Sequence, residues 1–239
     1  SKKIVYESSF HGKSGELKLD GFDVVIKSVI EILGDTDFAK EIIQFLNDAY
    51  STSKNLAEAT RKWTNSLLGK YGLVILDADV PLLKKNFAKV MEKELREQFT
   101  IPLVNKAMDL LSPEFTVQVN PREINLFYIN NETRNRIVKK ANSFEVLNTN
   151  LTFSEDQILL ELESHPEKFS PNVLLRPIYQ ETILPNLAYV GGPSEITYWL
   201  ELKFVFNELK LNMPILMLRN CAMVADRSTI AKWSKLGFQ

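Results

Sequence analysis

Two adjacent glycines between an apolar run and a helical pattern mark the stretch of this sequence that is best suited to bind a ligand. The stretch reads PNLAYVGGPSEITYWLELK, and the chain has only 9 glycines among 239 residues. Gly191 and Gly192 would let the backbone approach a ligand, because they lack a Cβ. Pro193 favours the first position of a helix, whose free N–H groups attract anions. The residues predict an anion site, although a plain strand-to-helix turn would use the same residues, and both interpretations are open.

The two residues after the proline extend this prediction. The N–H groups of Ser194 and Glu195 would point, with the helix dipole, at an anion bound in front of the helix. The Glu195 carboxylate could receive an ammonium group at the same place. A ligand that carries both a carboxylate and an amine would suit this combination. The alternative is that Glu195 only favours the helix N-terminus by its charge.

A second group of polar residues surrounds the end of a predicted strand at 172–177. It comprises Asn172, Arg176, Gln180 and Glu181 in the segment SPNVLLRPIYQET. Arg176 precedes a proline, which favours an extended backbone. Its guanidinium could hold a carboxylate or phosphate with two parallel hydrogen bonds. A salt bridge to Glu181 is the open alternative.

Other candidate residues carry weaker signals. Asp77 and Asp79 end an apolar run, where carboxylates can hold a ribose hydroxyl or a metal, but Asp79 is better explained as the cap of the next helix. Cys221 is expected to be a small buried side chain, because only two histidines could serve it as a base. Both of them, His11 and His165, read as surface turn residues. No zinc-binding spacing of Cys and His occurs, so no metal is predicted.

Composition excludes several classes of protein. Lys plus Arg total 29 and Asp plus Glu 30, so bulk charge favours neither nucleic acid nor an anionic membrane. The single cysteine excludes an internal disulfide framework and fits a reducing, cytoplasmic setting. No apolar stretch approaches the ~20 residues of a membrane helix. The chain starts without Met on a strand-like segment, so we expect it to be part of a longer protein.

Changes in hydrophobic period predict an α/β protein. Helical patterns cover 21–34, 36–50, 53–72, 80–99, 102–112, 154–165 and 193–210; apolar or alternating runs predict strands at 3–10, 15–20, 71–79, 115–120, 124–130, 144–148, 172–177, 186–192 and 214–220. Thr36 or Asp35, Ser53 and Ser154 are expected to cap helices. The strands at 186–192 and 214–220, joined by a helix, have the size of a βαβ unit.

The sequence resembles one family in the order and spacing of many residues: the bacillithiol-biosynthesis cysteine-adding enzymes, or BshC family. The most specific part is Asn172–Val–Leu–Leu–Arg176–Pro, Gln180–Glu181, Leu184–Pro185, Gly191–Gly192–Pro193, Glu195–Ile196 and Tyr198–Trp199. The segments GELKLDG, YGLVILDAD and MPILMLRNCAMVAD add further matches. Together these matches cover nearly the whole chain.

The resemblance implies a Rossmann-like parallel-sheet core with inserted segments and several helices. Residues 1–112 would form the first part of that core, 113–152 a small β-rich antiparallel connecting segment, and 153–239 the second part. The family's opening segment and its coiled coil have no counterpart in these residues. The chain would then be the central portion of a longer enzyme.

The resemblance also implies a function: the ligation of L-cysteine, through an amide bond, to the glucosamine amine of glucosaminyl-malate, the last step of bacillithiol synthesis. Such enzymes are cytoplasmic and dimerise through the coiled coil. The cofactor is unknown, and a nucleotide such as ATP or ADP is an open expectation. We expect the isolated chain to be inactive. The rival hypothesis is a non-catalytic module that binds a small molecule or nucleotide.

In this family-based interpretation the candidate residues take specific roles. Gly191, Gly192 and Ser194 bind malate or the cysteine carboxylate, and Arg176 holds a carboxylate. Glu195 or Glu181 holds the amine, and Gln180 lines the same place. Tyr198 or Asn172 donates orienting hydrogen bonds. Because an ammonium is not nucleophilic, a base is needed, and Glu195 is the first candidate for this catalytic role.

Overall fold

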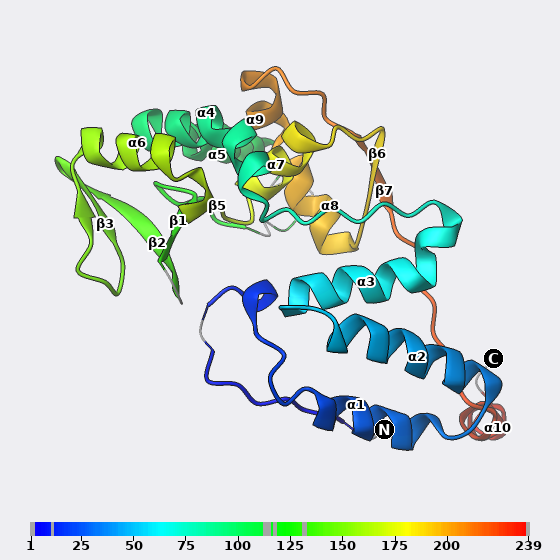
Figure 1. Cartoon of the computed structure of the whole chain (residues 1–239). Helices are drawn as coiled ribbons and strands as arrows, with labels where there is room; N and C mark the ends of the chain where they lie inside the picture. Colours follow the sequence, from blue (N-terminus) through cyan, green and yellow to red (C-terminus); the bar gives the residue numbers. More distant parts are fainter. Residues whose placement is uncertain (1–2, 11, 112–115, 117–118, 131–132, 238–239) are drawn as a thin grey trace.

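A computed structural model describes residues 3–10, 12–111, 116, 119–130 and 133–237 of the chain. Helices α1 to α3 form one part, and a larger part contains the strands together with most of the other helices (Figure 1).

The helices are α1 (Asp23–Leu33), α2 (Asp37–Ser51), α3 (Leu56–Leu68), α4 (Pro81–Glu97), α5 (Thr100–Leu111), α6 (Glu155–Ser164), α7 (Leu175–Ile183), α8 (Pro193–Leu200), α9 (Lys203–Glu208) and α10 (Arg227–Lys235). Short 3₁₀ turns are η1 (Ser14–Glu16), η2 (Gly69–Tyr71) and η3 (Pro166–Lys168). The strands are β1 (Leu126–Asn130), β2 (Thr133–Lys140), β3 (Ser143–Val146), β4 (Thr152–Phe153), β5 (Phe169–Pro171), β6 (Ala188–Gly191) and β7 (Ile215–Leu218).

An antiparallel sheet forms the centre of the larger part. Within the described residues its strand order is β4-β3-β2-β1-β5, and each neighbouring pair runs antiparallel. Helices α4 and α6 lie along one side of this sheet (Figure 1). Because strand side chains alternate between faces, one face buries Leu126, Tyr128 and Ile137 against the helices. The small antiparallel segment expected from the sequence is therefore present, and β5 joins it from beyond residue 152.

The second sheet is a parallel pair that positions the candidate site. Strands β6 and β7 pair in register, with Gly191 opposite Leu218. Helices α8 and α9 connect them, as expected for a βαβ unit. The α/β class is confirmed. Among the described residues, however, parallel pairing is limited to these two strands.

The strand expected at 172–177 is wrong, because α7 begins there. The Asn172 side-chain oxygen accepts hydrogen bonds from the N–H groups of Leu174, at 2.9 Å, and Leu175, at 3.2 Å. This is the way a helix N-terminus is satisfied. Pro177 then lies in the first turn of the helix, where its missing N–H is harmless.

The strands expected at 3–10, 15–20 and 71–79 are also wrong. These residues pair with no strand of the described chain. The apolar run at 71–79 is a surface segment, with Val74 82% exposed and Leu76 45% exposed. An apolar run cannot distinguish a buried strand from an uncovered segment, because the covering partner lies elsewhere in the chain. Half of the expected strand at 115–120 lies outside the described residues, and the described residues 116, 119 and 120 belong to no strand.

Several local signals of the sequence are confirmed and others are corrected. Thr36 caps α2 and Ser154 closes a capping box at α6. Asn55 rather than Ser53 caps α3, since its side chain accepts from the N–H of Glu58 at 3.0 Å. The expected helix 193–210 is divided into α8 and α9 by the turn at 201–202. Strand β2 was not predicted, because its polar sequence TRNRIVKK lacks apolar alternation.

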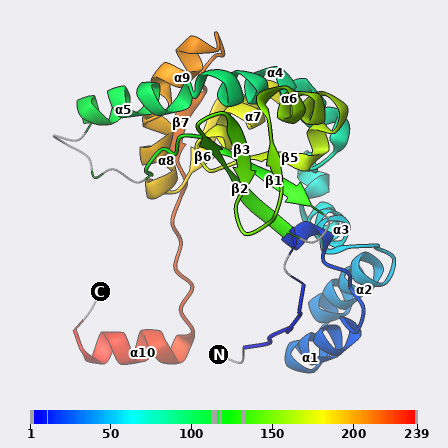
Figure 2. The same ribbon diagram turned by 90° about the vertical axis from the view of Figure 1, so that its left-hand side faces the viewer.

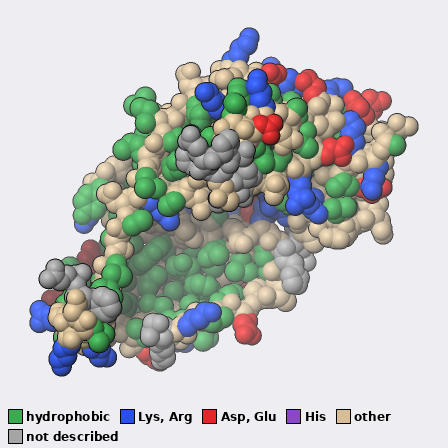
Figure 3. All heavy atoms as spheres, turned by 180° about the vertical axis from the view of Figure 1, so that it is seen from behind, with side chains coloured by type: hydrophobic (Ala, Val, Ile, Leu, Met, Phe, Trp, Pro, Cys, Tyr) green, Lys and Arg blue, Asp and Glu red, His purple; other side chains and the backbone are tan. Residues whose placement is uncertain are grey.

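The surface has one prominent apolar hollow and one extended arm. Seen from behind, hydrophobic side chains line a hollow between the lower and the upper part (Figure 3). Helix α10 lies at the end of an extended segment, apart from α1 to α3 (Figure 2). Within the described residues no helix is long and apolar enough to span a bilayer.

Candidate functional site

The candidate site lies where β6 ends and α8 begins. The Gly191 carbonyl accepts a hydrogen bond from the N–H of Arg219 at 2.9 Å, which holds the ends of β6 and β7 together. In a parallel arrangement the carboxyl ends of neighbouring strands meet at one edge, beside the N-termini of the helices that follow. The fold therefore brings Arg219 to the Gly191–Gly192 turn.

Glu195 closes this turn. Its carboxylate accepts a hydrogen bond from the N–H of Gly192 at 2.8 Å and one from the Tyr189 hydroxyl at 3.2 Å. The first of these bonds is the acidic half of a capping box. The Gly192 hydrogen bond, above all, lowers the pKa of Glu195 below its ordinary value, and Arg219 and Arg176 contribute by charge. The carboxylate is therefore ionised at neutral pH.

The glycine pair makes room for side chains. A Cβ at Gly191 would lie 2.6 Å from Cε1 of Tyr189, and one at Gly192 would lie 3.2 Å from Nη2 of Arg219. Neither residue has a positive φ; the φ of Gly192 is -70°. Gly192 is the N-cap of α8 with an extended backbone, so neither glycine is required by a left-handed conformation. The close approach of two neighbouring side chains explains both glycines.

Arg176 extends from α7 toward α8. It donates to the Tyr198 hydroxyl at 2.9 Å and to the Gln180 side-chain oxygen at 3.2 Å. Burial acts to lower its pKa, but the phenols of Tyr198 and Tyr189 raise it above the ordinary value. In the described chain no carboxylate lies within 4 Å of this guanidinium. The alternative salt bridge to Glu181 is therefore not formed.

Glu181 and Asn172 have structural partners. Glu181 is only 3% exposed and accepts hydrogen bonds from the N–H and the side-chain amide of Asn186, at 2.8 and 2.9 Å, and from Gln180 at 3.1 Å. The Asn172 oxygen caps α7, and its amide donates to the Asn125 oxygen at 2.8 Å. Arg176 is thus hydrogen-bonded to Gln180 and Tyr198, and its charge acts on Glu195. Ser194 is exposed in the first turn of α8.

Comparison with known proteins assigns the chain to a family. The family model described as "Bacillithiol biosynthesis BshC, N-terminal Rossmann-like domain" matches residues 1–220. The chain belongs to the BshC family. It is 44% identical to a protein of Flavobacterium johnsoniae and 43% identical to one of Flavobacterium psychrophilum, over 98% of the chain and 44% of each relative. A protein of Cytophaga hutchinsonii is 41% identical over 98% of the chain. Each of these relatives is named "Putative cysteine ligase BshC", and the chain spans less than half of their length.

Two residues of the candidate site were not predicted from the sequence. The Tyr189 ring stacks on the buried Trp199 ring, with centroids 4.0 Å apart, and so presents its hydroxyl to Glu195. Arg219 reaches the turn from the end of β7. Tyr189 precedes the end of the predicted strand 186–192 by three positions, and Arg219 precedes the end of the predicted strand 214–220 by one. Alignment of the two strand ends would have found both.

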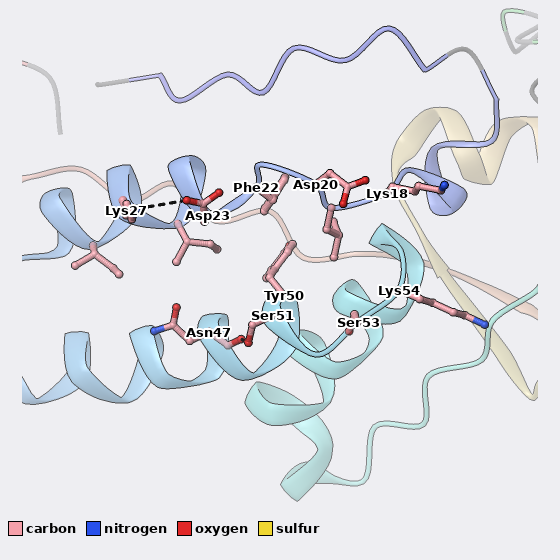
Figure 4. Close-up of a pocket in the computed structure, with 13 residues that line it drawn as sticks. Lys18, Asp20, Phe22, Asp23, Lys27, Asn47, Tyr50, Ser51, Ser53 and Lys54 are labelled. Atoms are coloured by element: carbon pink, nitrogen blue, oxygen red, sulfur yellow. Dashed lines mark hydrogen bonds and ion pairs between the residues drawn. The ribbon is translucent and has the colours of Figure 1, made fainter.

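The GELKLDG segment of the family resemblance lines a separate cavity of about 600 Å³ between the loop before α1 and the helices α1 and α2. Figure 4 shows Lys18 and Asp20 on the loop, Phe22 and Asp23 at the start of α1, and Tyr50 on α2. The Phe22 and Tyr50 rings stack with centroids 4.8 Å apart. Burial raises the pKa of Tyr50. Charges of both signs line this cavity, so its chemistry is not selective for one charge.

The remaining sequence candidates fall outside the site. Asp79 does not cap α4, whose N-cap is Val80; instead it forms ion pairs with Lys13 and Lys84. Cys221 is exposed, so its expected burial is wrong, because it lies in the irregular segment that follows β7.

His165 lies on the surface as expected, and His11 lies outside the described residues. No group of three or more His, Cys, Asp or Glu in the described ranges could hold a metal.

Proposed function

We propose that the chain forms the Rossmann-like part of a ligase that adds L-cysteine to glucosaminyl-malate, in the last step of bacillithiol biosynthesis. The reaction joins the cysteine carboxylate to the glucosamine amine in an amide bond. Family membership and the names of the relatives support a role as a ligase of this pathway. The observation that carries the proposal is the convergence of Arg176, Arg219 and Glu195 at the N-terminus of α8.

The two guanidinium groups and the start of α8 suit a carboxylate ligand. The N–H group of Ser194 and the helix dipole favour negative charge at this end, whereas the N–H of Gly192 already donates to Glu195. Arg176 donates hydrogen bonds to Tyr198 and Gln180, and a guanidinium has five N–H donors in all. We assign to Gly191, Gly192, Ser194 and Arg176 the binding of malate or of the cysteine carboxylate. Tyr198 and Gln180 orient the guanidinium.

Glu195 remains our candidate catalytic residue. It could either hold the amine as an ammonium group or accept a proton from it. A carboxylate whose pKa is lowered stays ionised and can hold an ammonium group. The same shift makes it a poor acceptor for a proton, since a general base works best with a pKa near the operating pH. The structure thus favours holding the amine over removing its proton. Glu181 is less suited to either role, because it is only 3% exposed and accepts three hydrogen bonds from Asn186 and Gln180.

The proposal includes further features of the complete protein. It is a cytoplasmic homodimer that assembles through a coiled coil beyond these residues. A nucleotide such as ATP or ADP is the candidate cofactor. The isolated chain does not turn over.

The test is product formation by the complete protein from glucosaminyl-malate and L-cysteine, followed by mass spectrometry. A product heavier than glucosaminyl-malate by cysteine minus water supports the ligase. If the complete protein binds glucosaminyl-malate but gives no such product with ATP, ADP or neither present, a non-catalytic binding module is the better account.

A further inference from the structure

The open face of the antiparallel sheet carries a second cluster of cationic side chains. Arg134 and Arg136 are two apart on β2, so they lie on the same face, and Arg136 is paired with Phe127 of β1. The opposite face of these strands packs into the core. With Arg122, these residues line a cavity of about 530 Å³. The size falls in the range of small-ligand sites, about 300–1,000 Å³.

The charge of this cavity is of one sign. Three arginines line it, and no Asp or Glu does. Across the residues that the structure describes, none of the three guanidinium groups lies within 4 Å of a carboxylate. Surface arginines are usually accompanied by acidic neighbours in a chain with as many acidic as basic residues, and this chain has 30 and 29. Because no carboxylate pairs directly with these arginines, the cluster attracts an anion.

Arg134 is fixed in place before any ligand binds. Its guanidinium carbon lies 3.7 Å from the centroid of the Phe127 ring. Its Nε donates to the Ser170 hydroxyl at 2.8 Å, and one Nη donates to the Pro171 carbonyl at 3.0 Å. Stacking and two hydrogen bonds hold the planar group, so little conformational entropy is lost when its other donors bind a ligand. Burial lowers the pKa of Arg134, although Asp79 attracts its charge.

We propose that the cavity between Arg122, Arg134 and Arg136 binds a ligand through a phosphate or diphosphate group. Guanidinium groups recognise phosphate with parallel hydrogen bonds. Three of them balance the two to three charges of a diphosphate, whereas a single carboxylate would leave two unbalanced. None of the residues assigned to the α8 site lines this cavity, but Asn172, which accepts hydrogen bonds at the start of α7, does. The inference goes beyond the proposed ligase and does not rest on it.

The experiment is calorimetric titration of inorganic pyrophosphate into the complete protein at low salt. The variant Arg122→Gln/Arg136→Gln removes two charges whose side chains are exposed, and leaves the structural Arg134 in place. Lys140→Gln is the matched control, because Lys140 is exposed on the same strand and does not line the cavity. We expect at least a tenfold loss of affinity in the double variant, about 1.4 kcal/mol, and less than a twofold change in the control.

The outcomes separate the possible ligands. ADP binding tighter than pyrophosphate would assign the site to a nucleotide, and tighter pyrophosphate binding would assign it to a free phosphate compound; both support the proposal. Citrate binding as tightly as pyrophosphate would contradict it, and so would equal pyrophosphate affinities of the double variant and the control, or no saturable binding. If the double variant melts below the control, the two single variants are titrated, and each should lose at least threefold.

Discussion

The hydroxyl of Tyr189 donates a hydrogen bond to the carboxylate of Glu195 over 3.2 Å. Tyr189 belongs to β6 and Glu195 to the first turn of α8, so the bond fixes the helix against the strand that precedes it. Stacking on Trp199 holds the phenol in position. The carboxylate at the candidate site is therefore oriented by a packed aromatic pair and by the Gly192 N–H.

A methyl group at Gly191 should disturb this arrangement more than one at Gly192. The Cβ of Gly191→Ala would lie 2.6 Å from the Tyr189 ring, whereas that of Gly192→Ala would meet only the exposed end of Arg219 at 3.2 Å. Overpacking of this kind costs ~1–3 kcal/mol. Thermal denaturation of both variants should therefore show the larger loss for Gly191→Ala. Equal melting temperatures would contradict the steric explanation of the pair.

Glu195 should give the chain a pH-dependent increment of stability. Its pKa is lower in the folded than in the unfolded chain, so the stabilisation is present above the unfolded pKa, about 4.3, and is lost as the pH falls through the folded value. Glu195→Gln removes this increment. The difference in melting temperature between the wild type and Glu195→Gln should shrink from pH 7 toward pH 3. A difference that is independent of pH would refute the contribution of the ionised carboxylate.

Arg176→Lys should weaken substrate binding in the complete protein. Lysine keeps the charge but loses the planar fork that contacts both Tyr198 and Gln180. A charged hydrogen bond contributes ~1.5–3 kcal/mol, so the affinity for glucosaminyl-malate should fall at least tenfold. Tyr198→Phe is the companion variant, since it removes the acceptor and keeps the guanidinium. Unchanged affinity and unchanged stability of Arg176→Lys would exclude the assigned role.

The Asp79–Lys84 ion pair should stabilise the folded chain strongly. The Lys84 side chain is 4% exposed, its ammonium lies 2.5 Å from Asp79, and it also donates to the Glu167 carbonyl at 3.0 Å. Asp79→Asn leaves a buried charge without its partner, which costs ~3–5 kcal/mol. Asp77→Asn, at an exposed neighbour, is the control. Urea denaturation should show a lower free energy of unfolding for Asp79→Asn but not for Asp77→Asn. Equal free energies of unfolding for the two variants would mean that the Lys84 ammonium becomes hydrated.

Local signals predicted the strand-to-helix junction at Gly191–Pro193, because its geometry arises from a short segment. The glycine pair, Pro193 and Glu195 lie within five positions, and a strand followed by a helix N-terminus places them together. Arg176 was placed on a strand, yet it still reaches the site from α7. The contribution of Arg219 depends on how β6 and β7 pair, which is a long-range relationship that residue spacing alone does not define.

The errors in the predicted strands arise because local composition does not determine which segments pair in a sheet. The residues at 71–79 have the composition of a buried strand but pair with no strand in the described chain. Strand β2 has the composition of a loop but is held between β1 and β3. In both cases the environment supplied by distant residues overrides the local preference, as is general for strands.

The central claim is that Glu195 holds the reacting amine at the N-terminus of α8. It is tested most directly by kcat/KM for formation of the cysteine amide of glucosaminyl-malate by the complete protein, with Glu195→Gln compared to the wild type. Glu163→Gln, at an exposed carboxylate of α6, is the matched control. We predict a loss of at least ~100-fold for Glu195→Gln, about 2.7 kcal/mol, and less than twofold for the control. Wild-type kcat/KM in a folded Glu195→Gln enzyme would contradict the claim.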